Sequence, residues 1–213
     1  MNESKAPKVV LINGSPHKNG TTDRALSELQ ATLESEGIEC VKIWIGAKVV
    51  GGCIACGSCR RNGKCFQEDA VNAIAEEFRD ADGLVVGSPV YYASPNGGLL
   101  GVMDRLFYSS PFDKTMKVGA SVAVARRGGC TATFDVLNKY FTISGMPIAS
   151  SSYWNQVHGA VAEDAEEDKE GLQTMRNLGH NMAFLIKSIR LGKEALPFPV
   201  KENGSKTNFI KRN

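Results

Sequence analysis

The residues with the clearest capacity for chemistry are four cysteines close together in the sequence, Cys53, Cys56, Cys59 and Cys65. Thiolates bind zinc and iron, and a [4Fe-4S] cubane needs four of them. The two short x2 gaps let one loop wrap three corners of a small cluster. The run differs from the bacterial ferredoxin run, because five residues precede the last cysteine and phenylalanine follows it. Three interpretations therefore stay open: an iron-sulfur cluster, a structural zinc, or free thiols.

A second candidate is the loop at positions 14–22, GSPHKNGTT, which is rich in glycine and hydroxyl groups and leads into a predicted helix. Backbone N–H groups at a helix N-terminus can hold a dianionic phosphate together with the hydroxyls of Ser15, Thr21 and Thr22. The loop is neither a Walker loop nor the GxGxxG dinucleotide fingerprint. The alternative interpretation is an ordinary turn followed by a helix cap.

Two further loops could accept a planar ring. Positions 88–97, SPVYYASPNG, offer two tyrosines and two prolines, which form a stiff apolar wall or cover the core. Positions 125–130, ARRGGC, allow close approach of the backbone and present two arginines. An arginine near the pyrimidine edge of a flavin would stabilise the anionic reduced ring; otherwise the arginines form surface ion pairs.

These loops need a scaffold, and the hydrophobic pattern predicts one. Short buried strands are expected at residues 8–13, 39–45, 83–88, 118–125 and 146–150, and helices at 21–36, 69–79, 96–108, 131–144 and 171–191. Regular alternation of strand and helix predicts a three-layer, doubly wound α/β sandwich around a parallel sheet. Ligands of such sheets bind at the carboxyl ends of the strands. We expect the three loops and the cysteine loop to meet at that edge.

Composition sets the remaining bounds. A chain of 213 residues with 42% hydrophobic and 23% charged residues predicts a single domain, 1–213, with its core at 8–191 and a C-terminal tail at 197–213. A net charge of +2 argues against a general nucleic-acid binder. Because no apolar run approaches ~18 residues, we expect a cytoplasmic protein with no membrane partner. In that reducing compartment, clustered cysteines favour metal or redox chemistry over disulfides. The acidic run at 163–170 is interpreted as a solvated helix entrance.

Hydrolysis is disfavoured. The three histidines, His17, His158 and His180, lie in no GxSxG or HExxH motif. No cysteine has an arginine six positions later, the spacing that low-molecular-weight tyrosine phosphatases require. Cys40 and Cys130 are interpreted as lone buried thiols.

Taken together, these motifs resemble the NADPH-dependent FMN reductase family, which has the flavodoxin fold. The segments that carry the resemblance, over about residues 8–191, are GSPHKNGTT, GLVVGSPVYYASPNGGLLGVMDR, VAVARRGG and GMPIASSSYWNQVHG. Within that family, CIACGSCRRNGKC resembles the iron-sulfur flavoproteins of anaerobic microbes. The resemblance implies a five-stranded parallel sheet of order 2-1-3-4-5.

The resemblance also implies the cofactors and their residues. It implies FMN with its phosphate at the first loop and its ring between the other two, and a [4Fe-4S] cluster on the four clustered cysteines. The implied FMN residues are Ser15, His17, Lys18, Asn19, Thr21, Thr22, Pro89, Val90, Tyr91, Tyr92, Asn96, Gly97, Ala125, Arg126, Arg127 and Gly128. No side chain is assigned a catalytic role, because the ring carries the chemistry.

The expected activity is transfer of electrons from NAD(P)H or ferredoxin through FMN to a small acceptor, such as a quinone or a flavin. The resemblance implies a homodimer or homotetramer with FMN at the interface. It suggests a subunit contact near the flavin for His158, and the alternative interpretation of His158 is a surface or packing histidine. Two alternatives stay open: a flavodoxin-like electron carrier without its own substrate turnover, and a sensor in which the thiols respond.

Overall fold

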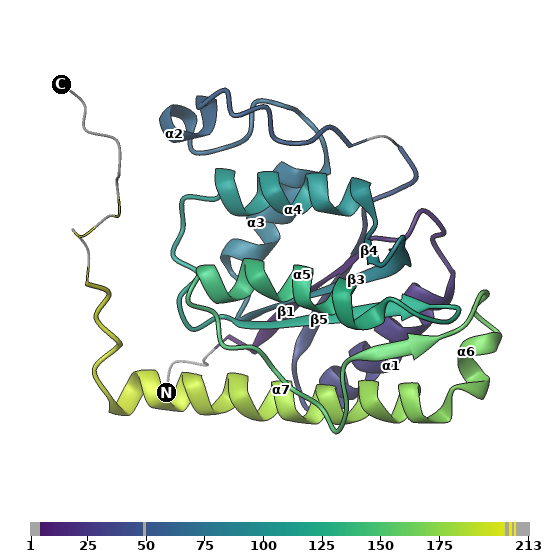
Figure 1. The fold of residues 1–213 in the computed structure, drawn as a ribbon. Coiled ribbons are helices and arrows are strands. Elements are labelled where there is room, and N and C mark those ends of the chain that lie inside the picture. Colours follow the sequence, from purple (N-terminus) through teal and green to yellow (C-terminus); the bar gives the residue numbers. More distant parts are fainter. Residues whose placement is uncertain (1–4, 49, 203–204, 206, 208–213) are drawn as a thin grey trace.

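The computed structural model describes residues 5–48, 50–202, 205 and 207, which form a sheet with helices on both faces (Figure 1). The strands are β1 (Lys8–Asn13), β2 (Glu39–Trp44), β3 (Gly83–Tyr91), β4 (Ser94–Pro95), β5 (Val118–Ala125) and β6 (Gln156–His158). The helices are α1 (Thr21–Ser35), α2 (Ser58–Asn62), α3 (Ala70–Arg79), α4 (Gly97–Ser109), α5 (Cys130–Ile143), α6 (Asp164–Glu167) and α7 (Lys169–Ala195).

The main sheet is parallel, with the strand order β2-β1-β3-β5-β6. Counted over the parallel strands alone, this is the predicted order 2-1-3-4-5. The short β4 is an addition, because it pairs antiparallel with the end of β3 and forms a hairpin. The predicted α/β class and topology are therefore confirmed.

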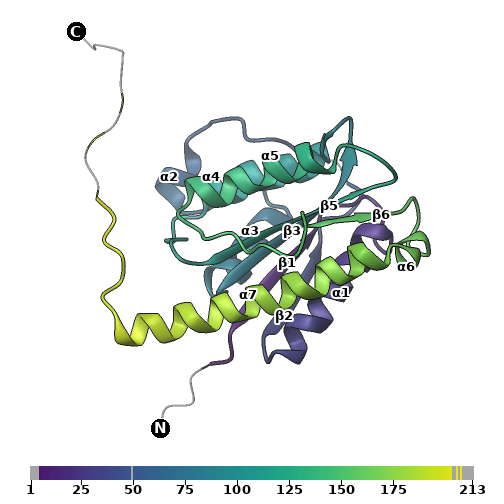
Figure 2. The ribbon, with the colours of Figure 1, turned by 60° about the horizontal axis from the view of Figure 1, so that its bottom comes forward.

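Alternate residues of the central strands supply the two faces of the sheet. Val9 and Leu11 of β1 pack with α1 and α7, whereas Val10 and Ile12 pack with α3, α4 and α5. Figure 2 shows α1 and α7 on one side of the sheet and α4 and α5 on the other. Because both faces are covered, the central strands are continuous apolar runs rather than alternating ones.

The fifth strand is not where the pattern predicted it. Residues 146–150 form only an isolated bridge between Ile148 and Gly119, and the ladder with β5 is made by β6, at Gln156–His158. Hydrogen bonds to α7 draw the intervening segment off the sheet, since the Ser151 hydroxyl donates to the carbonyl of Thr174 over 2.7 Å. The predicted strand at 146–150 is therefore wrong, because the segment makes one bridge to β5 and the fifth parallel strand is β6.

Two short helices were not predicted. The helix α2 lies inside the cysteine loop, and α6 forms from the acidic run. Asp168 then caps α7 by accepting a hydrogen bond from the N–H of Gly171 at 2.9 Å, in keeping with the predicted helix entrance. In the described part of the tail, residues 197–202 have no helix or strand, and positions 203–204, 206 and 208–213 lie outside the described residues.

None of the helices in the described ranges is both long enough and apolar enough to cross a lipid bilayer.

Candidate functional site

A cavity of about 710 Å³ lies at the carboxyl ends of β1, β3, β5 and β6, a volume typical of a site for a small molecule or cofactor. The predicted residues that line it are Ser15, His17, Lys18, Asn19, Thr21, Thr22, Pro89, Val90, Tyr91, Ala125 and Arg126. Tyr92, Asn96, Gly97, Arg127 and Gly128 do not line it. The structure therefore brings parts of all three predicted loops to one place.

Buried hydrogen bonds fix the shape of the loop after β1. The Asn13 side chain is fully buried; its amide group donates to the carbonyl of Lys18, and its oxygen accepts from the N–H of Ser15. The indole N–H of Trp44 donates to the carbonyl of Ser15 over 2.7 Å. The Ser15 hydroxyl in turn accepts from the N–H of His17. These contacts keep the loop open around the start of α1.

The start of α1 has the properties of an anion site. Its N-cap residue is Gly20, and no side chain caps the helix, so its first N–H groups stay available. Thr21 is 5% exposed, and within the described chain its hydroxyl oxygen has no hydrogen-bond partner, an arrangement that costs free energy unless a ligand satisfies it. This orphaned hydroxyl and the adjacent basic residues fit the phosphate of FMN.

The hairpin of β3 and β4 forms the wall of the cavity through Pro89, Val90 and Tyr91. At its tip Tyr92 has φ 51° and Ala93 φ 56°, so two non-glycine residues adopt the left-handed region, and Tyr92 is fully exposed. Asn96 is used locally, because its side chain accepts a hydrogen bond from the N–H of Leu99 and caps α4. The wall is therefore shorter than the sequence predicted.

Gly129 allows the loop after β5 to meet this wall. It has φ +97°, and a Cβ at this position would lie 2.7 Å from Cγ1 of Val90 and 3.0 Å from Cα of Ala93. Ala125 and Arg126, which precede Gly129 in this loop, line the same cavity as the hairpin.

The sequence prediction missed the far side of the cavity, which residues 159–163 form. This segment follows β6, and the carboxylate of Asp164 holds it by accepting from the N–H groups of Ala160 and Val161. The misplaced fifth strand concealed it. A strand ending at His158 would have put the next loop at the same edge as the other three.

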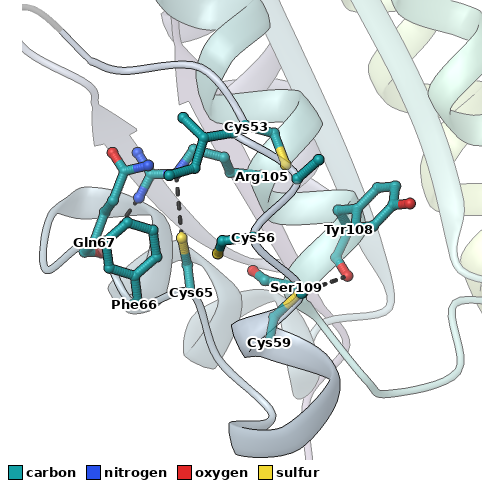
Figure 3. Close-up of a pocket in the computed structure, with 12 residues that line it drawn as sticks. Cys53, Cys56, Cys59, Cys65, Phe66, Gln67, Arg105, Tyr108 and Ser109 are labelled. Atoms are coloured by element: carbon teal, nitrogen blue, oxygen red, sulfur yellow. Dashed lines mark hydrogen bonds between the residues drawn. The ribbon is translucent and has the colours of Figure 1, made fainter.

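The four clustered cysteines line a second, separate cavity with Arg105, Tyr108 and Ser109 (Figure 3). Cys53 and Cys56 are exposed, Cys59 is partly buried, and Cys65 is buried. The N–H of Cys65 donates to the Asn72 side chain, which donates back to the carbonyl of Cys65. The loop therefore has one firmly held thiol and two exposed ones.

The position of this cavity corrects an expectation. The loop leaves the carboxyl edge after β2, but residues 50–52 cross α4 so closely that a Cβ on Gly101 would lie 3.3 Å from the carbonyl oxygen of Val50. The thiols then lie over Arg105, Tyr108 and Ser109. Because α4 connects two parallel strands, this half of the helix is on the side away from the carboxyl edge. The two cavities share no lining residue.

The donor set of the second cavity fits an iron-sulfur cluster, since four thiols and a buried Ser109 hydroxyl without a partner in the described chain face one space. That space is about 30 Å³, room for a water molecule rather than a cubane. The described residues include no ready-made group of three or more metal ligands. Assembly of a cluster would therefore require a rearrangement of this loop, in which Cys53 and Cys56 are the exposed thiols and Cys65 is the buried one.

The two remaining cysteines, Cys40 and Cys130, each have a thiol with a raised pKa. Burial raises the pKa of Cys40 to about 12 and that of Cys130 to about 11. At pH 8 roughly one in 10,000 Cys40 side chains and one in 1,000 Cys130 side chains is then a thiolate, the nucleophilic form. These thiols fit structural positions.

We therefore expect selective alkylation of the folded, metal-free protein. At pH 8, limited iodoacetamide should label the exposed Cys53 and Cys56 first, whereas labelling of Cys40 and Cys130 should rise about tenfold per pH unit up to pH 10. Peptide mass spectrometry measures each site. Equal rates for Cys40 and Cys53 at pH 8, with folding verified by circular dichroism, would contradict the assignment.

Comparison with known proteins adds to this geometry. Residues 7–160 match the model of a family described as NADPH-dependent FMN reductase. An iron-sulfur flavoprotein of Methanocaldococcus jannaschii is 34% identical over 194 residues, which cover 86% of this chain and 99% of that protein. An iron-sulfur flavoprotein of Methanosarcina thermophila is 28% identical over 191 residues, which cover 88% of this chain and 99% of that protein.

Among solved structures, a WrbA-like flavodoxin from Agrobacterium tumefaciens superposes with a TM-score of 0.60 at 17% identity, over 86% of this chain and 99% of that one. At this identity the likeness concerns the fold alone. It agrees with the parallel sheet and strand order described above.

Proposed function

Because this chain belongs to the NADPH-dependent FMN reductase family, and within it to the iron-sulfur flavoproteins, we propose that it passes electrons from NAD(P)H or ferredoxin through FMN to a small acceptor such as a quinone or a flavin. We propose further that Cys53, Cys56, Cys59 and Cys65 hold a [4Fe-4S] cluster. The observation that carries the flavin assignment is the cavity around the uncapped start of α1, with the orphaned hydroxyl of Thr21.

The chain's own residues bind and orient in this proposal, while bound FMN supplies the transfer of a hydride or of single electrons. The N–H groups at the start of α1 and the side chains of Ser15 and Thr21 hold the phosphate. Pro89 to Tyr91 would support the ring, and Arg126, which lines the same cavity, would favour a negatively charged reduced ring through its cation. No acid-base side chain is required.

In this proposal, the cluster on the cysteine loop is the site at which the enzyme exchanges single electrons with a partner. Its exposed thiols, Cys53 and Cys56, open to the surface, where a ferredoxin could exchange electrons. Because α4 follows the hairpin at the flavin cavity and its last turns line the cysteine cavity, one helix would connect the two cofactor sites.

We also propose that the protein assembles as a homodimer or homotetramer. The exposed large aromatic side chains include Tyr92 at the tip of the β3–β4 hairpin, and Tyr153 and Trp154 just before β6, at 51% and 50% exposure. Tyr153 and Trp154 contact each other, with their ring centroids 5.0 Å apart. Exposed aromatic side chains such as this pair are enriched at protein interfaces.

Anaerobic purification followed by counting flavin, iron and acid-labile sulfide per chain tests this function. We expect about one FMN and, after reconstitution, about four iron and four sulfide per chain. Stopped-flow reduction with NADPH, NADH and reduced ferredoxin then identifies the donor, and light scattering gives the assembly state. Less than one FMN per chain after reconstitution would overturn the flavin assignment. A monomer that accepts electrons but turns over no acceptor would instead support the electron-carrier alternative.

A further inference from the structure

Arg105 is the largest fully buried side chain in the described part of the chain, and its hydrogen-bond partners indicate what it does there. A guanidinium has five N–H donors, and Arg105 has five acceptors for them. Both carboxylate oxygens of Asp69 accept, at 2.6 Å and 2.9 Å, as do the carbonyls of Gly51 at 3.3 Å and Gln67 at 3.2 Å. The fifth acceptor is the sulfur of Cys65, 3.3 Å from Nε.

All five acceptors belong to the segment 51–69, which contains the four clustered cysteines. Burying an arginine is costly, and the paired carboxylate of Asp69 offsets that cost. The carbonyls of Gly51 and Gln67 lie on either side of the cysteines, so one guanidinium ties the two ends of the loop to α4. A buried cation is thus dedicated wholly to the cysteine loop.

The hydrogen bond from Nε to Cys65 does more than hold the loop. A neutral thiol is a weak acceptor, whereas a thiolate that ligates metal accepts a charge-assisted hydrogen bond. A purely structural arginine would be served equally well by another carbonyl. This donor is therefore placed where negative charge would gather on a ligand sulfur.

Ser109 provides a second donor on the same face of α4, because residues four apart in a helix lie one above the other. Its side chain lines the cysteine cavity and is 6% exposed, and its hydroxyl has no hydrogen-bond partner among the described residues. Figure 3 shows it with the cysteines that line the same cavity. The neighbouring Ser110 hydroxyl is also buried and has no partner among the described residues. Ser110 does not line the cysteine cavity, although both serines line a neighbouring cavity.

We propose that α4 positions and tunes the cluster: Arg105 holds Cys65 in place, and Arg105 and Ser109 donate hydrogen bonds to sulfur atoms of the bound cluster and raise its reduction potential. The inference rests on the proposed [4Fe-4S] function of this loop. Arg105 and Ser109 are positioning residues, since neither ligates iron.

The test compares Ser109→Ala and Arg105→Lys with two matched controls, Ser110→Ala and Arg60→Lys. Ser110→Ala removes an equally buried hydroxyl outside the cysteine cavity, and Arg60 is an exposed arginine of α2 in the same loop. Redox titration followed by electron paramagnetic resonance measures the cluster potential. We expect Ser109→Ala to keep wild-type iron and shift the potential to a more negative value, and Arg105→Lys to shift it in the same direction. Both controls should match the wild type.

Hydrogen exchange in the iron-free protein tests the positioning role separately. Amides of residues 51–67 should exchange at least about tenfold faster in Arg105→Lys than in the wild type, because the lysine cannot serve five acceptors. Wild-type potentials in Ser109→Ala and Arg105→Lys, with a fully loaded cluster, would overturn this inference and leave the proposed function standing. A wild-type chain that takes up no iron and sulfide would overturn both. If Arg105→Lys fails to fold, Ser109→Ala against Ser110→Ala still decides the tuning role.

Discussion

Replacing Cys56 with alanine is expected to remove most of the iron and acid-labile sulfide from the protein while FMN stays at about one per chain. A cubane needs four thiolates, and the run supplies only four close together. Cys56 is exposed, so its truncation should change the free energy of unfolding of the iron-free protein by less than about 0.5 kcal/mol. Loss of iron would then reflect loss of a ligand rather than damage to the fold.

The matched control is Cys40→Ser, which removes a thiol outside the loop and should leave iron and sulfide unchanged. Elemental analysis and sulfide assay of anaerobically reconstituted samples measure the effect. One zinc per chain without sulfide, lost in Cys56→Ala, would favour the zinc interpretation. If the wild-type protein bound neither iron nor zinc, the free-thiol interpretation would be correct and the proposed cluster would be contradicted.

The sequence predicts the scaffold well because burial on both faces leaves a simple signature. The strands Lys8–Asn13 and Val118–Ala125 lie at the predicted positions, since each contains a buried apolar run without polar alternation. The predicted position of the fifth strand was wrong because the strand that forms has no such signature. Its three residues, Gln156–His158, are too few to give a pattern, and the apolar stretch before them forms a single bridge.

The path of the cysteine loop is a second feature that the sequence could not predict. Residue types and spacing indicate its chemistry, but its path over α4 depends on Gly101, where the backbone of residues 50–52 approaches the helix. The burial of Arg105 could not be predicted from the sequence either. An arginine near a helix end is normally exposed, and its acceptors lie 36 to 54 residues earlier in the chain. Only the folded structure shows that they converge.

Replacing Thr21 with valine is expected to change stability and FMN affinity in opposite directions. Valine keeps the shape of threonine and removes a buried hydroxyl that has no partner in the described part of the chain. The FMN-free protein should therefore gain about 1 kcal/mol in its free energy of unfolding. FMN should bind about 10- to 100-fold more weakly, because a hydrogen bond to a charged phosphate contributes about 1.5–3 kcal/mol.

The matched control is Thr133→Val, since the Thr133 hydroxyl is also buried and unpartnered in the described chain but the residue does not line the flavin cavity. It should stabilise the FMN-free protein similarly and leave FMN affinity unchanged. Urea unfolding gives the first quantity, and quenching of flavin fluorescence on binding gives the second. Wild-type FMN affinity in Thr21→Val would show that the phosphate does not use this hydroxyl. If Thr133→Val weakened FMN binding equally, the effect would not be local to the flavin cavity. Of the two threonines, Thr21 alone lines that cavity, at the uncapped start of α1.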